Sequence, residues 1–562
     1  MAVLLKPTPN WEEHEKPTLP GSASMPYHTP AVRVAYACVA LLVGITGGLG
    51  NALVTANLAT IQGQLGLTPS EGAWLPAAYV MVNITVNMLV FKFRQQYGLR
   101  LFAEIGLGLY AAVTLLHLLV GGFAMAVLVR AASGFAAGTA TTLSMLYMLQ
   151  AAPRAYTGKM VVIGVGIPQL ATPLAWLLSP TLLVFGQWHN LYLFEAGLAL
   201  CSLAAVVVLK LPPGMHVKVF EKKDFISFAL MAPGAAMLVA VLAQGYSHWW
   251  FDEAWLAWLL IGAVVFILAA LFVEHHRENP LLQTRWLVTP NILRFIVGAF
   301  LIRFLTSEQT FGAVGLLRTL GMGPDQMQPL FVVILAGTIV GMLASALTFS
   351  PKTLIAQLIA AIVLFGVAAM IDYGRTSLDR PEDFFLSQFL VALGSGMFMG
   401  PLVFLGISQA LKYGPNYVVT FTVVLSLTQS LGAMTGSALL STYQLHREQV
   451  YSSALTADIN PADPQVAMRL QQQQGVYRAL VTDPVQRAAQ GTALLSQIAR
   501  REANVRAFND VFALSGMLAL AFLSWSLFVA IRASVRNRRA AAAAVATATA
   551  SPNPAPPGAT KA

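Results

Sequence analysis

Long apolar runs separated by short polar loops repeat along almost the whole chain. A transmembrane helix needs about 20 consecutive apolar residues, and fourteen runs reach that length. We expect helices rather than a barrel, because barrel strands would appear as short segments of alternating polarity. The expected spans are 32–58, 71–92, 99–120, 123–149, 158–179, 190–211, 224–245, 254–274, 291–316, 326–348, 353–373, 384–408, 416–442 and 509–533.

The seventh and eighth spans look like an insertion between two six-helix halves. They lie between a basic loop at 210–223 and the polar segment 275–285. The count alone suggests paired halves, as in many transporters. We therefore predict an all-α polytopic membrane protein with two six-helix bundles plus two inserted central helices. Its expected parts are an N-terminal bundle (31–211), an inserted pair with linkers (212–280) and a C-terminal bundle (281–533).

Basic residues gather in alternate loops, and this predicts the orientation of the chain. The loops after spans one, three and five contain no Lys or Arg. Lys and Arg concentrate in cytoplasmic loops, so the loops after even-numbered spans and both termini are expected in the cytoplasm. Residues 1–30, with six prolines, and residues 534–562 are expected to be disordered cytoplasmic tails.

Composition supports a membrane protein and excludes several functions. Hydrophobic residues make up 57% of the 562 residues, charged residues only 10%, and the mean hydropathy is +0.66. Soluble proteins average about 25% charged residues. The net charge of +10 does not indicate nucleic-acid binding, because the basic residues lie in short loops. The chain has no GxxxxGK[ST] phosphate loop, metal-ligand cluster or nucleophile–base arrangement. We therefore expect no enzyme activity, no cofactor and no ATP-driven work by this chain alone.

Arg130 is an unusual charge within the fourth span. Gly134 and Gly138 follow at four-residue steps, so the three residues lie on one helical stripe. A charge at this depth is costly and marks a functional residue by default, while glycines let a neighbouring helix approach. Arg130 could attract an anionic substrate or a carboxylate, or it could tie helices together through backbone carbonyls.

Few carboxylates lie inside the spans. Glu308 and Arg303 lie in span nine, about 140° apart around the helix, so they are not expected to pair with each other. Glu195 lies near the outer end of span six. With Arg130, these are our candidates for proton coupling or substrate binding. The alternatives are a structural ion pair for Glu308 and an interfacial carboxylate for Glu195. His117, near a span end, is expected to be interfacial.

Polar and flexible residues supply further candidates. Those expected to line a cavity, or else to make hydrogen bonds between helices, are Asn51, Asn57, Gln388 and Gln429. Those expected to act in gating or as hinges are Gly98, Arg100, Glu104, Gly134, Gly138, Gly164, Gly166, Pro168 and Pro173. Glu104 is expected to contact Arg94 or Arg100.

The segment 443–508 departs from the pattern of short loops. It is polar, glutamine-rich and favours helix, and the orientation above places it outside the membrane. It could form a helical lid over the last two spans, or a docking surface for a periplasmic partner.

Several motifs resemble the EmrB/QacA-type drug:proton antiporters of the major facilitator superfamily. They are the stretch Leu49–Tyr79, the Arg-x-x-x-Gly motif Arg130–Gly134, LHREQV (445–450) and REANVRAFNDVF (501–512). The resemblance implies proton-coupled efflux of amphipathic small molecules or drugs by alternating access across a bacterial inner membrane. It implicates the fourth-span arginine in coupling. It also suggests a periplasmic adaptor and an outer-membrane channel as partners.

Three departures from the family pattern bear on the mechanism. Gly50 stands where the family often has an acid, and Gln95–Gly98 replaces the usual Asp-Arg-x-Gly. The fifth-span motif keeps its glycines and prolines but loses the Gly-Pro and Gly-Gly pairs. The partner of Arg130 must therefore lie elsewhere, and Glu308 and Glu195 are the candidates.

Two alternatives to drug export follow from the sequence. The chain could be an importer or uniporter of small organic anions, or a receptor or assembly subunit that docks through 443–508.

Overall fold

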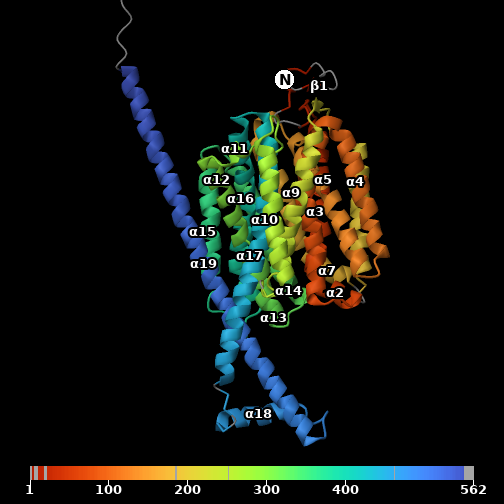
Figure 1. The fold of residues 1–562 in the computed structure, drawn as a ribbon, viewed down its shortest axis with the longest axis vertical. Coiled ribbons are helices and arrows are strands. Elements are labelled where there is room, and N and C mark those ends of the chain that lie inside the picture. The colour runs from red at the N-terminus through yellow and green to blue at the C-terminus, as the bar shows by residue number, and fades with distance from the viewer. Residues whose placement is uncertain are drawn as a thin grey trace, which may run out of the picture.

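A computed structural model describes residues 3–4, 11–17, 22–183, 187–250, 252–457, 459–460 and 462–549. Its helices stand side by side in one bundle (Figure 1). Fourteen helical segments within these ranges are long and apolar enough to cross a membrane, which confirms the expected number.

The N-terminal half contains spans one to six. The fifth span is broken directly after Gly166, where η3 contains Pro168, which has no N–H to donate. The elements are α1 (Pro30–Ala56), α2 (Leu58–Leu65), α3 (Pro69–Tyr97), α4 (Leu99–Leu116), η1 (His117–Leu119), α5 (Phe123–Gln150), η2 (Arg154–Tyr156), α6 (Thr157–Gly166), η3 (Ile167–Leu170), α7 (Ala171–Leu182) and α8 (His189–Val208).

The inserted pair consists of α9 (Lys222–Gln244) and α10 (Ala254–His275). α9 packs against α3 and also contacts α17 of the C-terminal half. Ala77 and Ile84 of α3 and Val239 of α9 form one apolar cluster, on which Leu427 of α17 also packs. The inserted pair therefore lies along a line where the two halves meet.

The C-terminal half contains the remaining spans, and a π-helical turn interrupts the first of them. Its elements are α11 (Thr284–Leu287), α12 (Pro290–Leu305), the π turn η5 (Glu308–Ala313), α13 (Val314–Thr319), α14 (Pro324–Leu347), α15 (Leu354–Asp372), η6 (Pro381–Phe384), α16 (Phe385–Leu411), α17 (Pro415–Ala457), α18 (Pro464–Val476) and α19 (Pro484–Thr549).

The two ends of the bundle differ. One end carries strand β1 (Val3–Leu4) and the last turns of α19, and we call it the tail face (Figure 1). The opposite end carries α18, and we call it the hairpin face. The charge pattern of the loops predicts that the tail face is cytoplasmic.

The N-terminal segment makes ordered contacts on the tail face, where we expected a disordered tail. β1 pairs with β2 (Val217–Lys218) in the linker between the halves. The Gln150 amide at the end of α5 donates to the Ser24 carbonyl at 3.1 Å, and Arg154 Nη1 donates to the Glu13 carbonyl at 2.7 Å. Backbone groups of the segment thus find partners on the bundle.

Segment 443–508 is largely helical, but it does not form a lid. α17 and α19 continue straight out of the bundle, and α18 joins them at a distance from it (Figure 1). Arg447 of α17 pairs with Asp510 of α19 at 2.5 Å, and the Gln444 amide donates to Asn504 at 2.8 Å. At its other end α19 is helical to Thr549, well into the stretch expected to be disordered. Residues 550–562 of that tail lie outside the described ranges.

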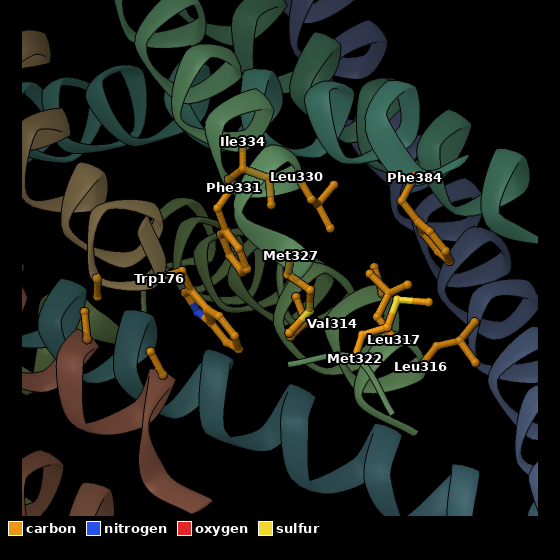
Figure 2. Close-up of a cluster of buried hydrophobic side chains, with 14 of the residues drawn as sticks. Trp176, Val314, Leu316, Leu317, Met322, Met327, Leu330, Phe331, Ile334 and Phe384 are labelled. Atoms are coloured by element: carbon orange, nitrogen blue, oxygen red, sulfur yellow. The ribbon is translucent and has the colours of Figure 1, made fainter. Parts of the chain in front are cut away.

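The halves meet in an apolar core near the hairpin face (Figure 2). Trp176 of α7 stacks on Phe331 of α14, with ring centroids 4.5 Å apart and planes inclined by 9°. Arg318 of α13 lies over the Trp176 ring at 4.7 Å and donates to the Ala56 carbonyl at 3.0 Å. Nearer the tail face, the Asn87 amide of α3 donates to Ser426 of α17 at 3.2 Å. The halves therefore touch toward both ends.

Candidate functional site

Arg130 ties three helices together inside the N-terminal half. Its side chain is 1% exposed. Nη1 donates to the Gly50 carbonyl at 2.8 Å, and Nη2 donates to Asn51 Oδ1 at 2.7 Å. Nε donates to the Leu75 carbonyl at 3.4 Å, and the guanidinium lies over the Tyr79 ring at 4.8 Å. The arginine thus holds the polar end of span one in place, which matches the helix-tying alternative.

The glycine stripe that follows Arg130 allows this close packing. A Cβ on Gly134 would collide with the Tyr79 carbonyl of α3, and one on Gly138 would lie 2.9 Å from Asn87 Oδ1. The Asn83 amide of α3 also donates to the Gly134 carbonyl at 3.0 Å. Both glycines therefore permit the approach of a neighbouring helix.

Glu195 lies on the other side of Gly50. It is 2% exposed and accepts a hydrogen bond of 2.6 Å from Tyr110 Oη. Tyr110 Oη also lies 3.1 Å from the Thr46 carbonyl. A Cβ on Gly50 would lie 2.5 Å from Glu195 Oε1, so the carboxylate fills the space that a side chain on span one would need. Gly50 therefore has Arg130 on its carbonyl and Glu195 beside its Cα.

Arg130 and Glu195 form no direct ion pair within the described part of the chain. His117, expected at the interface, is instead 2% exposed and stacks on Tyr192 at 4.0 Å. It also contacts Ser133 Oγ at 3.4 Å, one helical turn from Arg130.

A second buried polar cluster, which contains two carboxylates, lies in the C-terminal half toward the hairpin face. Gln388 Nε2 of α16 donates to Asp372 Oδ2 of α15 at 3.0 Å and to Glu308 Oε1 at 3.5 Å. All three side chains are at most 2% exposed. Asp372 also pairs with Arg375 Nη2 at 2.7 Å. One amide therefore bridges two carboxylates from different helices.

Glu308 is the first residue of the π turn η5. Such turns insert one extra residue into a helix and often occur at functional sites. Arg303, one turn earlier, donates to Thr306 Oγ1 at 3.3 Å and, as expected, does not reach Glu308.

The sequence reasoning missed Asp372 and Tyr110. Asp372 ends a long apolar run directly before Tyr373-Gly374, so it was indistinguishable from the start of a loop. Tyr110 carries no charge, and nothing in the sequence singles it out. Their roles depend on contacts between distant segments.

The expected cavity residues separate into different surroundings. Asn51 lies in the cluster around Arg130, and Gln388 lies in the cluster with Glu308 and Asp372. Asn57 instead ends α1, where its amide donates to the Leu53 carbonyl at 2.8 Å and to Ser179 Oγ at 2.7 Å. Gln429 of α17 has a buried Nε2 with no hydrogen-bond partner among the described residues.

The expected hinge residues of span five lie at its break. A Cβ on Gly164 would lie 2.9 Å from Met145 Cα of α5, and one on Gly166 would lie 2.7 Å from Met342 Sδ of α14. Pro168 lies within η3, and Pro173 lies in the first turn of α7. Gly166 therefore faces the C-terminal half, whereas Gly164 packs on α5 of its own half.

The loop after span two carries the other gating candidates. Gly98 ends α3 with φ +91°, which favours glycine. Arg100 Nε lies 2.8 Å from Glu104 Oε1, which confirms one of the two expected contacts.

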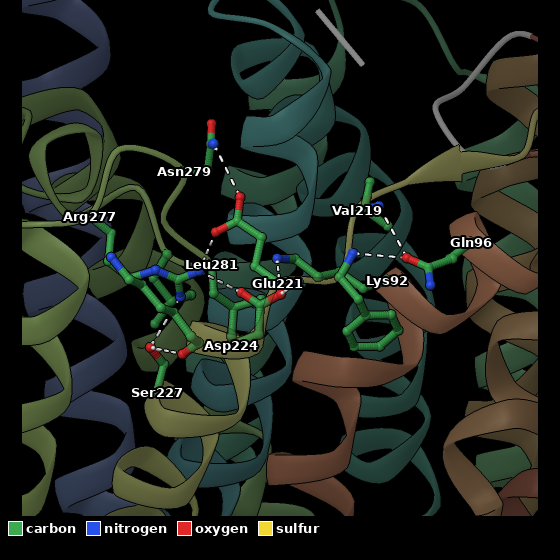
Figure 3. Close-up of polar contacts among 12 residues, drawn as sticks. Lys92, Gln96, Val219, Glu221, Asp224, Ser227, Arg277, Asn279 and Leu281 are labelled. Carbon is green, nitrogen blue, oxygen red and sulfur yellow. Dashed lines mark hydrogen bonds and ion pairs between the residues drawn. The ribbon is translucent and has the colours of Figure 1, made fainter. Parts of the chain in front are cut away.

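A buried ion network ties span two to the inserted pair at the tail face (Figure 3). Lys92 Nζ of α3 lies 2.7 Å from Asp224 Oδ2 of α9. Arg277, directly after α10, pairs with Asp224 Oδ1 at 2.8 Å and Glu274 Oε1 at 2.7 Å. Burial alone would lower the pKa of Arg277, but hydrogen bonds to Asp224 and Glu274 raise it above its usual value. Arg277 therefore stays charged.

The loop that departs from the family pattern also contacts the linker. Gln96 Oε1 accepts hydrogen bonds from the backbone N–H groups of Val219 at 3.2 Å and Phe220 at 3.0 Å. A neutral amide at this position thus anchors the strand that leads into α9.

Comparison with known proteins identifies the family. Residues 40–437 match the model described as Major Facilitator Superfamily. The chain belongs to the major facilitator superfamily. It is therefore a membrane transporter rather than an enzyme, and the resemblance inferred from the motifs is confirmed.

Named relatives agree with this family. The multidrug export protein EmrB of Haemophilus influenzae is 21% identical over 496 residues, covering 85% of this chain and 92% of the relative. The Escherichia coli K12 protein of the same name is 22% identical over 446 residues, covering 76% and 83%. Among solved structures, tetrameric PepTSo2 has a TM-score of 0.53 at 12% identity, covering 90% of this chain and 99% of that chain. That likeness shows a shared fold.

Proposed function

We propose that this major facilitator chain is a proton-coupled exporter of amphipathic small molecules that works by alternating access. We place it in a bacterial inner membrane, with the tail face and both termini in the cytoplasm. The charge pattern of the loops supports this orientation. The export direction is supported by the two relatives, both named as multidrug export proteins.

The observation that carries the coupling proposal is the burial of Glu195 and Glu308 without an ion pair to either carboxylate among the described residues, with a second carboxylate, Asp372, on the amide that Glu308 contacts. Each is 2% exposed, and their hydrogen bonds come from Tyr110 and Gln388 rather than from a cation. A buried carboxylate without a positive partner is far less costly when it carries a proton. A carrier that exposes such groups to one side and then the other can move protons between the two sides.

Arg130 positions the N-terminal cluster, which consists of Gly50, Asn51 and Glu195, in this proposal. It holds the backbone of Gly50 and the side chain of Asn51, and Glu195 lies directly beside Gly50. When Glu195 releases its proton, the guanidinium across Gly50 provides a nearby positive charge. The clusters of the two halves can then load and release protons as the halves move.

A susceptibility panel on a strain lacking this chain tests the export function. We expect the deletion to increase sensitivity to amphipathic compounds, and the wild-type chain to restore resistance. Glu308→Gln should fail to restore it, whereas Glu382→Gln, an exposed carboxylate near the same face, should restore it fully. Unchanged sensitivity of the deletion strain across the panel would contradict export.

We also propose that the extension formed by α18 and the outer ends of α17 and α19 binds a periplasmic adaptor, which leads to an outer-membrane channel. The extension stands clear of the bundle (Figure 1) and exposes apolar side chains, among them Met468, Leu480 and Val485. Exposed apolar groups are typical of protein-binding surfaces where they gather into a contiguous patch.

Replacing residues 458–483 with a short linker tests the docking proposal. The shortened chain should lose co-purification of a co-expressed periplasmic adaptor but keep transport in proteoliposomes. Retained co-purification would contradict docking at this surface and leave the transport proposal untouched.

A further inference from the structure

Arg375 follows α15 at the hairpin face and pairs with the last residue of that helix, Asp372. Gly374, at φ +95°, turns the chain directly after the helix, a conformation that favours glycine. The Arg375 guanidinium donates to Asp372 Oδ1 from Nη2 at 2.7 Å and from Nε at 3.3 Å. Nη2 also donates to the Asp383 carbonyl at 2.7 Å, and the guanidinium lies over the Phe384 ring at 4.4 Å. The turn therefore holds a cation against Asp372.

The C-terminal cluster, which consists of Glu308, Asp372 and Gln388, combines two carboxylates with this one cation among the described residues. Asp372 has both oxygens bonded, Oδ1 to Arg375 and Oδ2 to the Gln388 amide at 3.0 Å. Glu308 receives only the same amide, at 3.5 Å. A cation beside a carboxyl favours its charged form, whereas burial and a second carboxylate favour its protonated form. The charges balance when Asp372 is ionised and Glu308 carries one proton.

The carbonyl oxygen of Gln388 also favours a proton at this place. Gln388 is fully buried, and its Oε1 has no donor among the described residues. A protonated carboxyl has an O–H to donate, whereas a carboxylate has none. Because the Gln388 amide already contacts Glu308, a half-turn of the amide would place Oε1 where that O–H can reach it. The cluster thus contains an acceptor that is used only when a carboxyl is protonated.

The other elements that pack on the π turn η5 direct their charges elsewhere. α12 and α13 carry Arg303 and Arg318, which donate to oxygen atoms outside the cluster. α17 and α19 also contact η5, and their Arg447 and Asp510 pair with each other at 2.5 Å. Within the described ranges, Arg375 is therefore the cation that decides how the two carboxylates hold a proton.

Asn509 of α19 fixes the backbone of this arginine. α19 packs along α15 (Figure 1). Asn509 Oδ1 accepts hydrogen bonds from the backbone N–H groups of Gly374 at 2.9 Å and Arg375 at 2.8 Å. Its Nδ2 donates to the Arg375 carbonyl at 2.7 Å. One side chain, from the motif REANVRAFNDVF (501–512), therefore clamps the turn that carries the cation.

We propose that Asn509 is a positioning residue for the C-terminal cluster. By clamping the turn it keeps Arg375 on Asp372, so that Asp372 stays ionised and the single proton of the cluster resides on Glu308. When the clamp is released, Arg375 withdraws and Asp372 takes up a second proton from water. The proposal rests on the proton-coupled export proposed above, because it names the contact on α19 that regulates proton binding at that site.

Infrared spectra of the chain in lipid nanodiscs report the protonation of Asp372 without substrate or gradient. Aspartate labelled with ¹³C at its side-chain carboxyl separates protonated Asp from protonated Glu, and the Asp372 band is the one that Asp372→Asn removes. We expect the wild-type chain to show no such band at neutral pH. Arg375→Gln should show it, because the loss of a cationic partner raises the pH at which a carboxyl ionises by about one to three units.

Two asparagines of α19 provide the matched comparison. Asn509→Ala should show part of the Asp372 band, because the turn is released although Arg375 remains. Asn509→Asp keeps an acceptor for both backbone N–H groups and should match the wild-type spectrum. Asn504→Ala loses a hydrogen bond of 2.8 Å with Gln444 of α17 but leaves the turn intact, so it should also match wild type.

The pH dependence of export in proteoliposomes gives a second readout. Arg375→Gln and Asn509→Ala should move the pH profile toward higher pH, because the cluster then keeps its protons to a higher pH. Asn504→Ala should leave the profile in place.

Three results would overturn the proposal. They are a protonated Asp372 band in the wild-type chain at neutral pH, the absence of that band in Arg375→Gln, and equal spectra for Asn509→Ala and Asn504→Ala. The spectra need no transport. A chain that gives the expected spectra but moves no protons would therefore contradict the proposed export and leave the role of Asn509 intact.

Discussion

At the scale of single residues, the position of Gly50 organises the N-terminal cluster. The Arg130 guanidinium bonds its carbonyl, and the Glu195 carboxylate fills the space beside its Cα. The family that this chain resembles often has an acidic residue on span one. In this chain the carboxylate of Glu195, from span six, occupies the same place. The two sequence candidates therefore act on one backbone position without touching each other.

Gly50→Ala tests this arrangement. The new Cβ would lie 2.5 Å from Glu195 Oε1 and would displace the hydrogen-bonded pair with Tyr110. Misplacing a reacting group by about 1 Å can cost about a hundredfold in rate, so we expect transport to fall by about ten- to a hundredfold. Gly197→Ala, on the same helix as Glu195, has nothing within 4 Å of the added atom and should transport normally. Equal activity of both variants would show that the Glu195 position is unimportant.

Arg130→Lys tests the helix-tying geometry. Lysine cannot reproduce the planar fork that reaches Gly50 and Asn51 together. At least one buried acceptor would lose its donor, which costs about 1–3 kcal/mol of unfolding free energy. Thermal unfolding in nanodiscs should show a lower midpoint, and transport should fall as well. A thermal unfolding midpoint equal to that of the wild-type chain would contradict the proposal that Arg130 ties the helices together.

Single residues were predictable from the sequence where they carried a charge or an amide in an apolar run, and Asn51 and Gln388 are the two amides that lie in the clusters. Arg130, Glu195 and Glu308 were found in this way. Asp372 was hidden at a span end, and Tyr110 was hidden because it is neutral. Most of their partners could not be predicted, because contacts such as Tyr110 with Glu195 or Gln388 with Glu308 join helices that are far apart in the sequence.

At the scale of elements, the ion network fixes the inserted pair to span two. Asp224 is fully buried between Lys92 and Arg277. Breaking a buried pair from one side leaves an uncompensated charge, which costs about 3–5 kcal/mol, whereas replacing both partners by apolar groups is often neutral.

We therefore expect Asp224→Leu to lower the thermal midpoint strongly. The double variant Lys92→Met/Asp224→Leu should recover most of the loss, because Lys92 is then no longer left as an uncompensated buried charge. Arg100→Ala, which breaks the exposed pair with Glu104, should change unfolding free energy by less than about 1 kcal/mol. If the double variant is no more stable than Asp224→Leu, the network does not act as a coupled unit.

The spans themselves were predictable, because hydropathy reports directly on burial in lipid. The break at η3 was indicated by the hinge candidates Gly166 and Pro168, but the π turn at Glu308 and the outward course of α17 and α19 were not predictable. Hydropathy does not report whether a helix stays continuous within the membrane or continues beyond it. The polar segment 443–508 was expected to be helical, but its composition did not show that α17 and α19 continue into it without a break.

At the scale of the whole molecule, the two halves touch toward both faces, and alternating access requires each contact to open in turn. Spin labels at exposed Thr181 and Asp325 report the separation of α7 and α14 at the hairpin face. Labels at Ala155 and Lys352 report the separation at the tail face. We expect substrate and pH to lengthen one distance by several ångströms while the other stays short. Distances that lengthen together would contradict alternating access.

The central claim is that buried carboxylates couple protons to export, and it is tested most directly in proteoliposomes. Protein is reconstituted with a pH-sensitive dye inside and a substrate identified by the susceptibility panel. We predict that substrate movement drives proton movement in the opposite direction. Glu308→Gln should lose proton flux but retain substrate exchange, and Glu382→Gln should match wild type. Substrate transport by the wild-type chain without proton movement, or unchanged proton flux in Glu308→Gln, would contradict the account.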